Sequence, residues 1–400
     1  MPACQLCQKF FRNALASVHC YRRNALLDAA AALSGDAPLT LTGIGRSLPG
    51  RARVKAKIKR VDRLLGNERL HRELPLIAKN IAAMLTEHLS WCVIAVDWSG
   101  YAWSAFHVLR ASLVFDGRAI PLMSRVVPEE QLNSLQVQAD FLDALHAAIG
   151  PGRRVVVLTD AGFKSAWFRH VSALGWDFIG RVRGNNRFRL DGDGQAWQEA
   201  GSCAGVTGKP AGLGSGELFR TRTARCAGYF YGYKKPSARR KAWRARGRPH
   251  YAAANREHSA SAKEPWVLFC STDRYSAKTV IRLYSRRMQI EQNFRDEKSE
   301  RYGFGLRASQ SRSAARMAVP GLIAQLAGIM LWFAGYDFES RGLHRDYQAN
   351  SVRHCRVLSF LTLAKNVLRN APPAFTRVRP AEVLRRFAST YRETVLACCM

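Results

Sequence analysis

Three hydrophobic runs follow one another after residue 90, and they constrain the fold more than any other feature. They are 91–98 (WCVIAVDW), 104–115 (SAFHVLRASLVF) and 119–127 (AIPLMSRVV). Runs rich in β-branched and aromatic residues are typical of strands, and Asp116-Gly117 between the last two is a hairpin signal. We therefore expect three meandering strands in this part of the chain.

The pattern then changes to an alternation of helix and strand. A helical run at 135–149 leads into the strand signal RRVVVLTDAGF (153–163), then a helix, then LGWDFIGRVRG (174–184). A meander followed by alternating helices and strands builds a mixed sheet, so the fold class is α/β. This order of elements is that of a ribonuclease-H-like core.

The regions around this core differ from it in composition and in expected secondary structure. Residues 1–88 read as helical, and so does the chain from 311 to 400, with breaks near Gly342 and Pro372-Pro373. Between them, 184–264 is glycine-rich and then strongly basic, and 265–310 returns to an ordered strand and a long helix. We therefore divide the chain into regions 1–88, 89–183, 184–264, 265–310 and 311–400.

The basic segment KKPSARRKAWRARGRPH (234–250) carries eight Lys/Arg, and no acid occurs between Glu217 and Glu257. Such a stretch is either a mobile loop or is ordered by a polyanion. The nearby GVTGKP does not match a phosphate-binding loop, because the Lys is followed by Pro210 rather than Ser or Thr. ATP is therefore not expected as a cofactor.

Charge narrows the class of function. The chain has 62 Lys+Arg against 30 Asp+Glu, a formal net charge of +32. Such a field attracts polyanions and speeds association with DNA. Ribosomal and architectural proteins are usually small and poor in aromatics, whereas this chain has nine Trp. The balance favours an enzyme that acts on nucleic acid.

The segment 41–66 (LTGIGRSLPGRARVKAKIKRVDRLLG) concentrates eight cations against the single acid Asp62. A Pro-Gly break at Pro49-Gly50 separates two short helical runs, which suggests a helix-turn-helix laid on phosphates. The alternative is a merely solvated basic face. The DNA contacts that we predict here come from Arg51, Arg53, Lys55 and Lys59.

Cysteine usage and hydropathy bear on the compartment. The ten Cys are mostly scattered singly, so we expect no disulfide framework and a reducing, cytoplasmic location. Cys4 and Cys7 have a zinc-like spacing but lack a second pair. We expect no signal peptide, and we expect the apolar run 317–335 to be a buried core helix rather than a membrane span.

Two aspartates each end a hydrophobic strand signal. Asp97 follows WCVIAV and Asp160 follows VVVLT. The ends of strands line the site of an open α/β sheet, so the two carboxylates are candidate neighbours. The structural alternatives are a strand-end turn for Asp97 and a helix N-cap for Asp160.

A third carboxylate lies in the helical run 277–298. At 100° per residue Tyr284, Arg287, Glu291 and Lys298 share one narrow sector. That sector lies beside the apolar stripe of Val280, Leu283, Ile290 and Phe294. A surface salt-bridge lattice at i,i+4 spacing is the alternative, but it does not explain why the charges border the core.

Further acids in the same region are expected to be solvated or paired with Arg. They are Asp296, Glu297 and Glu300.

Phosphodiester cleavage accounts for this set of residues. It needs hard cations that clamp the attacking and leaving oxygens and are held by carboxylates with open positions. Asp97, Asp160 and Glu291 supply the carboxylates in this reading. Arg287, Lys298 and the Tyr284 hydroxyl then contact phosphates.

At these residues the sequence resembles the bacterial cut-and-paste DDE transposases of the insertion-sequence-four group. The signature of that group is Tyr, two residues, Arg, three residues, Glu, six residues, Lys, and residues 284–298 match every interval. VDWSG around Asp97 and TDAGF around Asp160 resemble the two aspartate motifs. The similarity extends from the basic segment near 45 to about Leu358.

The resemblance implies a ribonuclease-H-like core with a strand-rich insertion between the second Asp and the Glu. It also implies a homodimer on double-stranded DNA, namely the terminal inverted repeats and the target, with two Mg²⁺ or Mn²⁺ ions and no membrane. The implied reaction is hydrolysis of one strand, a hairpin intermediate, reopening, and joining to target DNA. Trp266 matches a Trp that stacks on a flipped base, although a core Trp is equally compatible with its position.

Two features depart from the group. Met288 stands where some members have a second aromatic, and the tail YRETVLACCM does not match the expected ending. The functional alternatives are a ribonuclease-H-like nuclease without strand transfer and an inactive DNA-binding remnant.

Overall fold

The chain divides into two compact units. Unit 1 comprises residues 1–153 and 288–394, and unit 2 comprises residues 154–287 and 395–400. The computed structural model describes residues 2–101, 105–192, 196–203, 208–234, 264–300, 303–349, 351–352 and 354–396. The predicted basic segment 234–250 lies outside these residues, apart from Lys234.

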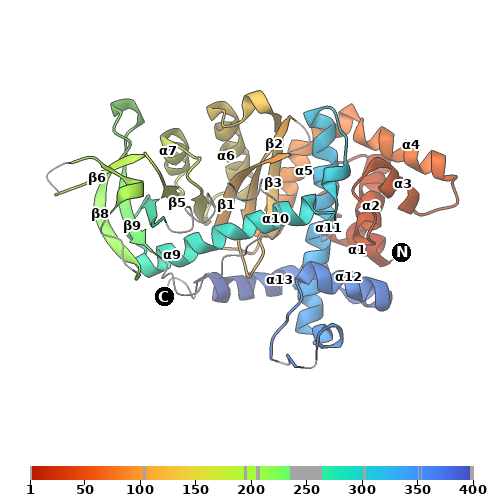
Figure 1. Cartoon of the computed structure of the whole chain (residues 1–400). Coiled ribbons are helices and arrows are strands. Elements are labelled where there is room, and N and C mark those ends of the chain that lie inside the picture. Colours follow the sequence, from red (N-terminus) through yellow and green to blue (C-terminus); the bar gives the residue numbers. More distant parts are fainter. Residues whose placement is uncertain are drawn as a thin grey trace, which may run out of the picture. The chain divides into compact units, whose positions relative to one another are not determined.

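Five helices open unit 1, as the sequence predicted for 1–88. They are α1 (Pro2–Phe10), α2 (Cys20–Ser34), α3 (Leu41–Ser47), α4 (Val54–Leu65) and α5 (Glu68–Thr86). The Thr40 side chain caps α3, and the Asn67 side chain caps α5. In Figure 1 these helices, red to orange, lie beside the long helix α11 (Ala314–Ser340).

The predicted meander forms the sheet of unit 1. The strands are β1 (Trp91–Tyr101), β2 (Phe106–Leu113) and β3 (Ile120–Pro128), paired antiparallel in the order β3-β2-β1. The antiparallel pairing of β2 with β3 across the connection 114–119 confirms the hairpin, and Gly117 in that connection has φ of +75°. A short 3₁₀ turn, η1 (Glu129–Gln131), leads to α6 (Leu135–Ile149), whose bounds agree with the predicted helix.

The C-terminal part of unit 1 is helical, also as predicted. Its elements are α10 (Gln289–Lys298), η6 (Leu306–Ala308), α11, η7 (Leu343–Tyr347), α12 (Phe360–Asn370), η8 (Pro372–Arg377) and α13 (Pro380–Tyr391), with the π-helical η9 (Arg392–Leu396) following.

Helix α11 forms the core of this part. It packs against α2, α12 and β3, and 83% of its most apolar window is buried in the protein. That burial favours the predicted core helix over a membrane span. The hydroxyl of Tyr391, at the end of α13, accepts a hydrogen bond from Val93 N (2.9 Å), which ties the C-terminal helices to β1.

Unit 2 contains a mixed sheet. Its strand order is β4-β5-β10-β9-β8-β6-β7, in which β4 and β5 are parallel and the other neighbours are antiparallel. The strands are β4 (Arg154–Thr159), β5 (Asp177–Val182), β6 (Arg187–Leu190), β7 (Gln198–Glu199), β8 (Ala211–Leu218), β9 (Cys226–Tyr233) and β10 (Trp266–Cys270). The other elements of this unit are α7 (Ser165–Ala173), η2 (Ala200–Ser202), η3 (Arg222–Ala224) and α9 (Ala277–Ser285).

The predicted fold class is confirmed: a meander of three strands is followed by alternating helices and strands, in the order of the ribonuclease-H-like core, with strands β6 to β9 between the second Asp and the Glu. The prediction for the signature helix was wrong. The helix expected over 277–298 is interrupted by a 3₁₀ turn, η5 (Arg286–Met288), between α9 and α10. A single 100° periodicity therefore does not run through the four signature residues.

Candidate active site

The predicted catalytic carboxylates and the predicted phosphate-contacting residues of the signature are distributed over both units. Asp97, Glu291 and Lys298 belong to unit 1, whereas Asp160, Tyr284 and Arg287 belong to unit 2. The contacts of these residues are therefore described unit by unit.

Asp97 lies inside β1, four residues before the end of the strand, so the prediction that it ends the strand was wrong. The strand continues because Ser99 and Gly100 pair with β2 through their backbones, in register with Val108 and His107. The Asp97 side chain is buried, with a residue exposure of 8%. Its Oδ1 accepts a hydrogen bond from Trp98 N (2.9 Å), so the carboxylate is held close to its own backbone.

Glu291 lies in the first turn of α10 and is exposed to solvent. The apolar stripe predicted for this region is buried, with Ile290 and Phe294 at 0% and 6% exposure on α10. Glu291 therefore projects from a helix whose other face is fixed in the core.

Helix α10 is attached to the sheet of unit 1 by polar contacts as well as apolar ones. The Gln289 side chain accepts from Phe115 N (2.9 Å) and donates to Phe115 O (3.0 Å), while Asn293 Nδ2 donates to Ala119 O (2.7 Å). Asp296 forms an ion pair with Arg118 (2.7 Å). These contacts run along the helix that carries Glu291 and fix it on the connection between β2 and β3.

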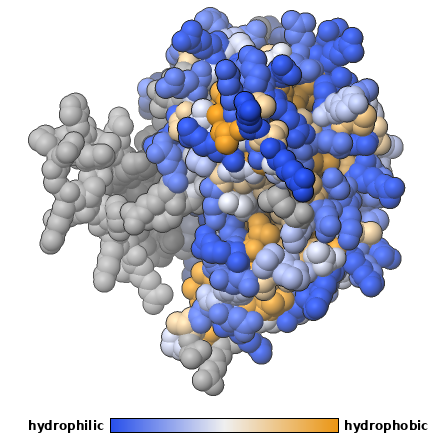
Figure 2. Space-filling model, turned by 90° about the vertical axis from the view of Figure 1, so that its right-hand side faces the viewer, coloured by the Kyte–Doolittle hydropathy of each residue, from blue (hydrophilic) through white to orange (hydrophobic). Residues whose placement is uncertain are grey.

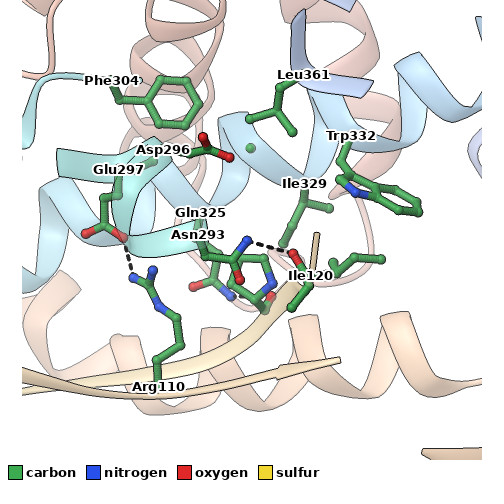
Figure 3. Close-up of a pocket in the computed structure, with 14 residues that line it drawn as sticks. Arg110, Ile120, Asn293, Asp296, Glu297, Phe304, Gln325, Ile329, Trp332 and Leu361 are labelled. Carbon is green, nitrogen blue, oxygen red and sulfur yellow. Dashed lines mark hydrogen bonds and ion pairs between the residues drawn. The ribbon is translucent and has the colours of Figure 1, made fainter. Parts of the chain in front are cut away.

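The most buried contact joins Glu297 to Arg110 of β2, and Figure 3 shows the two side chains facing each other. Their side-chain exposures are 6% and 3%. Glu297 also accepts from the Tyr101 hydroxyl (3.1 Å), and Arg110 Nε donates to Ser124 Oγ (2.9 Å). Asp296 and Glu297 are thus paired with Arg, as predicted, and Glu300 is exposed.

The cavity drawn in Figure 3 lies beside this pair. Its volume is about 40 Å³, and its lining includes Arg110, Asn293, Asp296 and Glu297. Pockets for small ligands have volumes of roughly 300–1,000 Å³. The cavity is therefore a feature of the packing and not a substrate site.

Lys298 is held against β1. Its Nζ donates to Ser99 Oγ (2.6 Å) and to Gly100 O (2.7 Å), and it lies over the rings of Tyr101 (5.2 Å) and Phe294 (5.4 Å). Burial, the largest cause, and the charges of Arg110 and Arg307 together lower the pKa of Lys298 to about 8, against the opposing effects of Glu297 and Asp97. Asp97 and Lys298 are thus brought within electrostatic reach of each other.

Asp160 directly follows β4, as predicted. Its Oδ1 accepts from Gly162 N (2.8 Å) and closes a turn. The helix that follows begins only at Ser165, with Lys164 at the N-cap position, so Asp160 does not cap it. One carboxylate oxygen is therefore used by the turn, and the side chain remains half-buried.

Tyr284 and Arg287 lie close to Asp160 in unit 2. Burial raises the pKa of Tyr284 to about 12, Arg287 and Arg181 act to lower it, and Asp160 acts to raise it. Both Tyr284 and Arg287 are buried, at 4% and 8% exposure. The structure therefore places these two signature residues beside the second predicted aspartate.

Arg181 is a neighbour that the sequence interpretation missed. It lies on β5, its side chain is 15% exposed, and Glu264 is 3.5 Å away. Burial lowers the pKa of Arg181, and the positive charges of Arg183 and Arg287 also lower it. The available signal was a cation inside the otherwise apolar run FIGRV (178–182).

Trp266 begins β10 and is half-buried. Its ring meets Tyr284 edge-on at 5.2 Å and Tyr233 at 6.0 Å. These contacts place it beside the signature residues of unit 2. They are compatible with both predicted roles, a base-stacking ring and a packed core ring.

The predicted helix-turn-helix is present in unit 1 as α3 and α4, joined by a turn in which Gly50 has φ of +96°. The four predicted DNA-contacting residues, Arg51, Arg53, Lys55 and Lys59, are all exposed. Not every cation of the segment is available, because Arg60 pairs with Asp28 (2.7 Å) and Lys59 pairs with Asp62 (2.9 Å). Figure 2, turned so that this side faces the viewer, shows mostly hydrophilic residues.

The predicted metal ligands are chemically suited to a hard cation, since all three are carboxylates. Within each unit, over its described residues, no group of three or more His, Cys, Asp or Glu side chains is arranged to hold a metal ion. The predicted triad takes residues from both units, and it stays a prediction.

Cys4 and Cys7, whose spacing resembles that of zinc ligands, both make side-chain contacts within the protein. Cys4 Sγ donates to Asp28 (3.5 Å), and Cys7 is buried against Met330 (3.5 Å). Burial raises the pKa of Cys7 far above its usual range, which disfavours the thiolate that zinc binds.

Comparison with known proteins identifies the family. No curated protein matches the sequence. Among solved structures, the cryo-EM structure of the piggyBac transposase synaptic complex with hairpin DNA is similar at 11% identity and a TM-score of 0.46, over 96% of this chain and 82% of that chain. The family described as the transposase DDE domain matches residues 90–324, more than half of the chain. The protein therefore belongs to the DDE transposase family.

Proposed function

We propose that the protein is a cut-and-paste transposase of the insertion-sequence-four group, close to the transposase of transposon ten. It binds the terminal repeats of its element, excises the element and joins it to target DNA. The observation that carries the proposal is the family match over residues 90–324, because that range contains Asp97, Asp160, Glu291 and the whole signature. A homodimer in the nucleoid of a bacterial cell is part of the same proposal.

Asp97, Asp160 and Glu291 would hold the two Mg²⁺ or Mn²⁺ ions. When bound, such ions would supply Lewis-acid catalysis at the attacking and leaving oxygens. The protein's own groups orient the DNA around that centre. The contacts of α10 with Phe115 and Ala119 hold Glu291 in place.

The cations of the site bind the phosphates next to the scissile bond. Arg181 and Arg287 lie beside the Tyr284 hydroxyl in unit 2, and Lys298 lies beside β1 in unit 1. Charge-assisted hydrogen bonds from these groups are stronger than neutral ones, and buried donors are less screened by salt. Every step of the proposed reaction is an in-line displacement at phosphorus, so one set of residues serves them all.

A supercoiled donor plasmid with two element ends, incubated with Mg²⁺, tests the proposal. Excision followed by joining supports it. Cutting without joining indicates a ribonuclease-H-like nuclease, and binding without cutting indicates an inactive DNA-binding protein.

Two variants assign the reaction to the predicted carboxylate. Glu291→Gln should bind the ends and not cut them, while the matched control Glu300→Gln, in an exposed carboxylate nearby, should cut normally. If Glu291→Gln excised as well as the parent, the assignment of Glu291 would be wrong.

A further inference from the structure

A large open cleft in unit 1 is lined by none of the residues predicted to bind DNA or metal. Its walls come from the two ends of the chain: α1, α2 and the connection between them on one side, and η8 with the start of α13 on the other. Helix α1 packs against η8, so these segments are neighbours in the fold. The cleft has a volume of about 1380 Å³.

The lining of the cleft is strongly basic. A single acid, Glu382, lines it together with six cations: Lys9, Arg12, Arg23, Arg377, Arg379 and Arg385. Among the salt bridges of the described residues, Arg379 is the only one of the six to take part, with Glu382 (3.0 Å). A concave surface lined by one sign of charge focuses the field and concentrates a ligand of opposite charge.

The cations project from packed elements. Phe10 of α1 contacts Phe333 of α11 with ring centroids 5.4 Å apart. On the other wall, Phe375 of η8 contacts Phe338 of the same helix at 5.1 Å. Both walls are therefore anchored on α11, and a ligand does not have to order them.

The composition of the lining indicates what the ligand is. Its other polar side chains include Gln5, Gln8 and Asn24, which hydrogen-bond well to phosphate oxygens, and it contains no aromatic residue. Single strands and nucleotides are bound by stacking on aromatic rings, so the lining disfavours them. The cleft is also larger and more polar than a typical small-molecule pocket.

An anionic membrane surface shares the phosphate chemistry, but the lining does not favour it. Membrane-surface binding needs exposed apolar side chains that insert between lipids. Among the described residues, none of the exposed large apolar side chains, such as Tyr21 and Val357, lines the cleft.

We propose that this basic cleft is a second DNA-binding surface, which holds the phosphate backbone of a duplex without reading its sequence. It shares no residue with the surface predicted on α3 and α4, so the two can engage different duplex segments. The inference rests on the proposed function, because a transposase must hold both an element end and other DNA.

The test compares two triple variants of the full-length protein. The cleft variant replaces three of its cations, Arg12→Gln, Arg23→Gln and Arg377→Gln. The matched control removes the same charge from exposed positions of unit 1 outside the cleft and α4, Arg69→Gln, Lys79→Gln and Arg345→Gln.

Binding of a duplex that lacks the terminal repeat is measured over a series of salt concentrations. Each lost phosphate contact lowers the slope of log affinity against log salt by about 0.9, so we expect the cleft variant to lose about 2 to 3 units of slope and at least roughly tenfold in affinity at low salt. The control should lose much less. Equal behaviour of the two triple variants would overturn the inference.

Two further measurements distinguish DNA binding by the cleft from lipid binding, and a failure of the cleft proposal from a failure of the proposed function. Vesicles of phosphatidylcholine with phosphatidylserine serve as the lipid probe, and a loss of vesicle binding without a loss of duplex binding overturns the proposal. The plasmid excision assay is run in parallel on the parent protein. If the parent does not excise but the cleft variant alone loses duplex binding, the proposed function fails and the cleft assignment holds.

Discussion

The Nζ atom of Lys298 lies 2.6 Å from Ser99 Oγ, so the last cation of the signature is held against the strand that carries Asp97. The Gly100 carbonyl and the rings of Tyr101 and Phe294 complete its surroundings. A long, flexible side chain is thereby fixed before DNA arrives. The same contacts fix the end of β1 beyond Asp97.

Burial of Lys298 should give the stability of the metal-free protein a distinct pH dependence. The folded-state pKa is about 8, below the ordinary value of 10.5, so the unfolded chain binds more protons between these values. The cost of burying the charge is fully present below pH 8 and disappears as the pH rises to 10.5. Relative to Lys298→Met, the parent should gain up to roughly 2 kcal/mol of unfolding free energy over this range, after allowance for solvent screening.

Urea unfolding of both proteins below pH 8 and near pH 10.5 measures this difference. Parallel pH profiles for the parent and Lys298→Met would show that the ammonium group is not desolvated in the folded state.

The buried pair of Arg110 and Glu297 should show strong energetic coupling. Arg110→Met leaves the Glu297 carboxylate buried with the Tyr101 hydroxyl as a remaining partner, and breaking a buried pair in this way costs about 3–5 kcal/mol. Adding Glu297→Gln removes the charge and keeps an acceptor for Tyr101. The double variant should therefore be more stable than Arg110→Met alone, as measured by urea unfolding in a double-mutant cycle. Additive effects would contradict direct coupling.

Most of the fold was predictable because its signals are local. The β-branched and aromatic residues between 91 and 127 predicted the strands, and Asp116-Gly117 predicted the hairpin. The continuation of β1 past Asp97 was not predictable in this way. Ser99 and Gly100 join the strand through backbone pairing with β2, which side-chain patterns do not report.

The surroundings of the candidate site residues could not be predicted from the sequence. The turn η5 interrupts the signature helix at Arg-Arg-Met, which contains no Pro or Gly to indicate a break. Arg110 and Glu297 are 187 residues apart in sequence, so only the folded chain reveals the contact that positions α10. Arg181 was overlooked because no sequence interval relates a cation in a strand to Tyr284, which lies in a helix distant in sequence.

Gly45 should be required for the approach of α3 to α4. A Cβ at this position would meet Ile58 Cα at 2.7 Å and Ile58 Cγ1 at 2.8 Å. Because one of these atoms is backbone, the helices must separate, and we expect Gly45→Ala to lower the unfolding free energy by about 1–3 kcal/mol. Binding of an element-end duplex, measured by fluorescence anisotropy, should weaken as well.

The control for this variant is Gly35→Ala. A Cβ there meets its nearest atom at 3.5 Å, an ordinary van der Waals contact, so its stability and DNA binding should be close to those of the parent. Should Gly45→Ala behave like Gly35→Ala, α3 and α4 do not pack as described.

Substitutions of Trp266 should separate its two predicted roles. If the ring stacks on a flipped base, Trp266→Ala should lower the yield of hairpin ends about 5- to 150-fold, because stacking contributes about 1–3 kcal/mol per base. The first strand nick, which needs no flipped base, should be much less affected. Trp266→Phe keeps a ring against Tyr284 and Tyr233 and should restore part of the hairpin yield. Gel separation of nicked and hairpin products measures both steps, and urea unfolding reports stability; equal losses in nicking, hairpin formation and stability would identify Trp266 as a core residue alone.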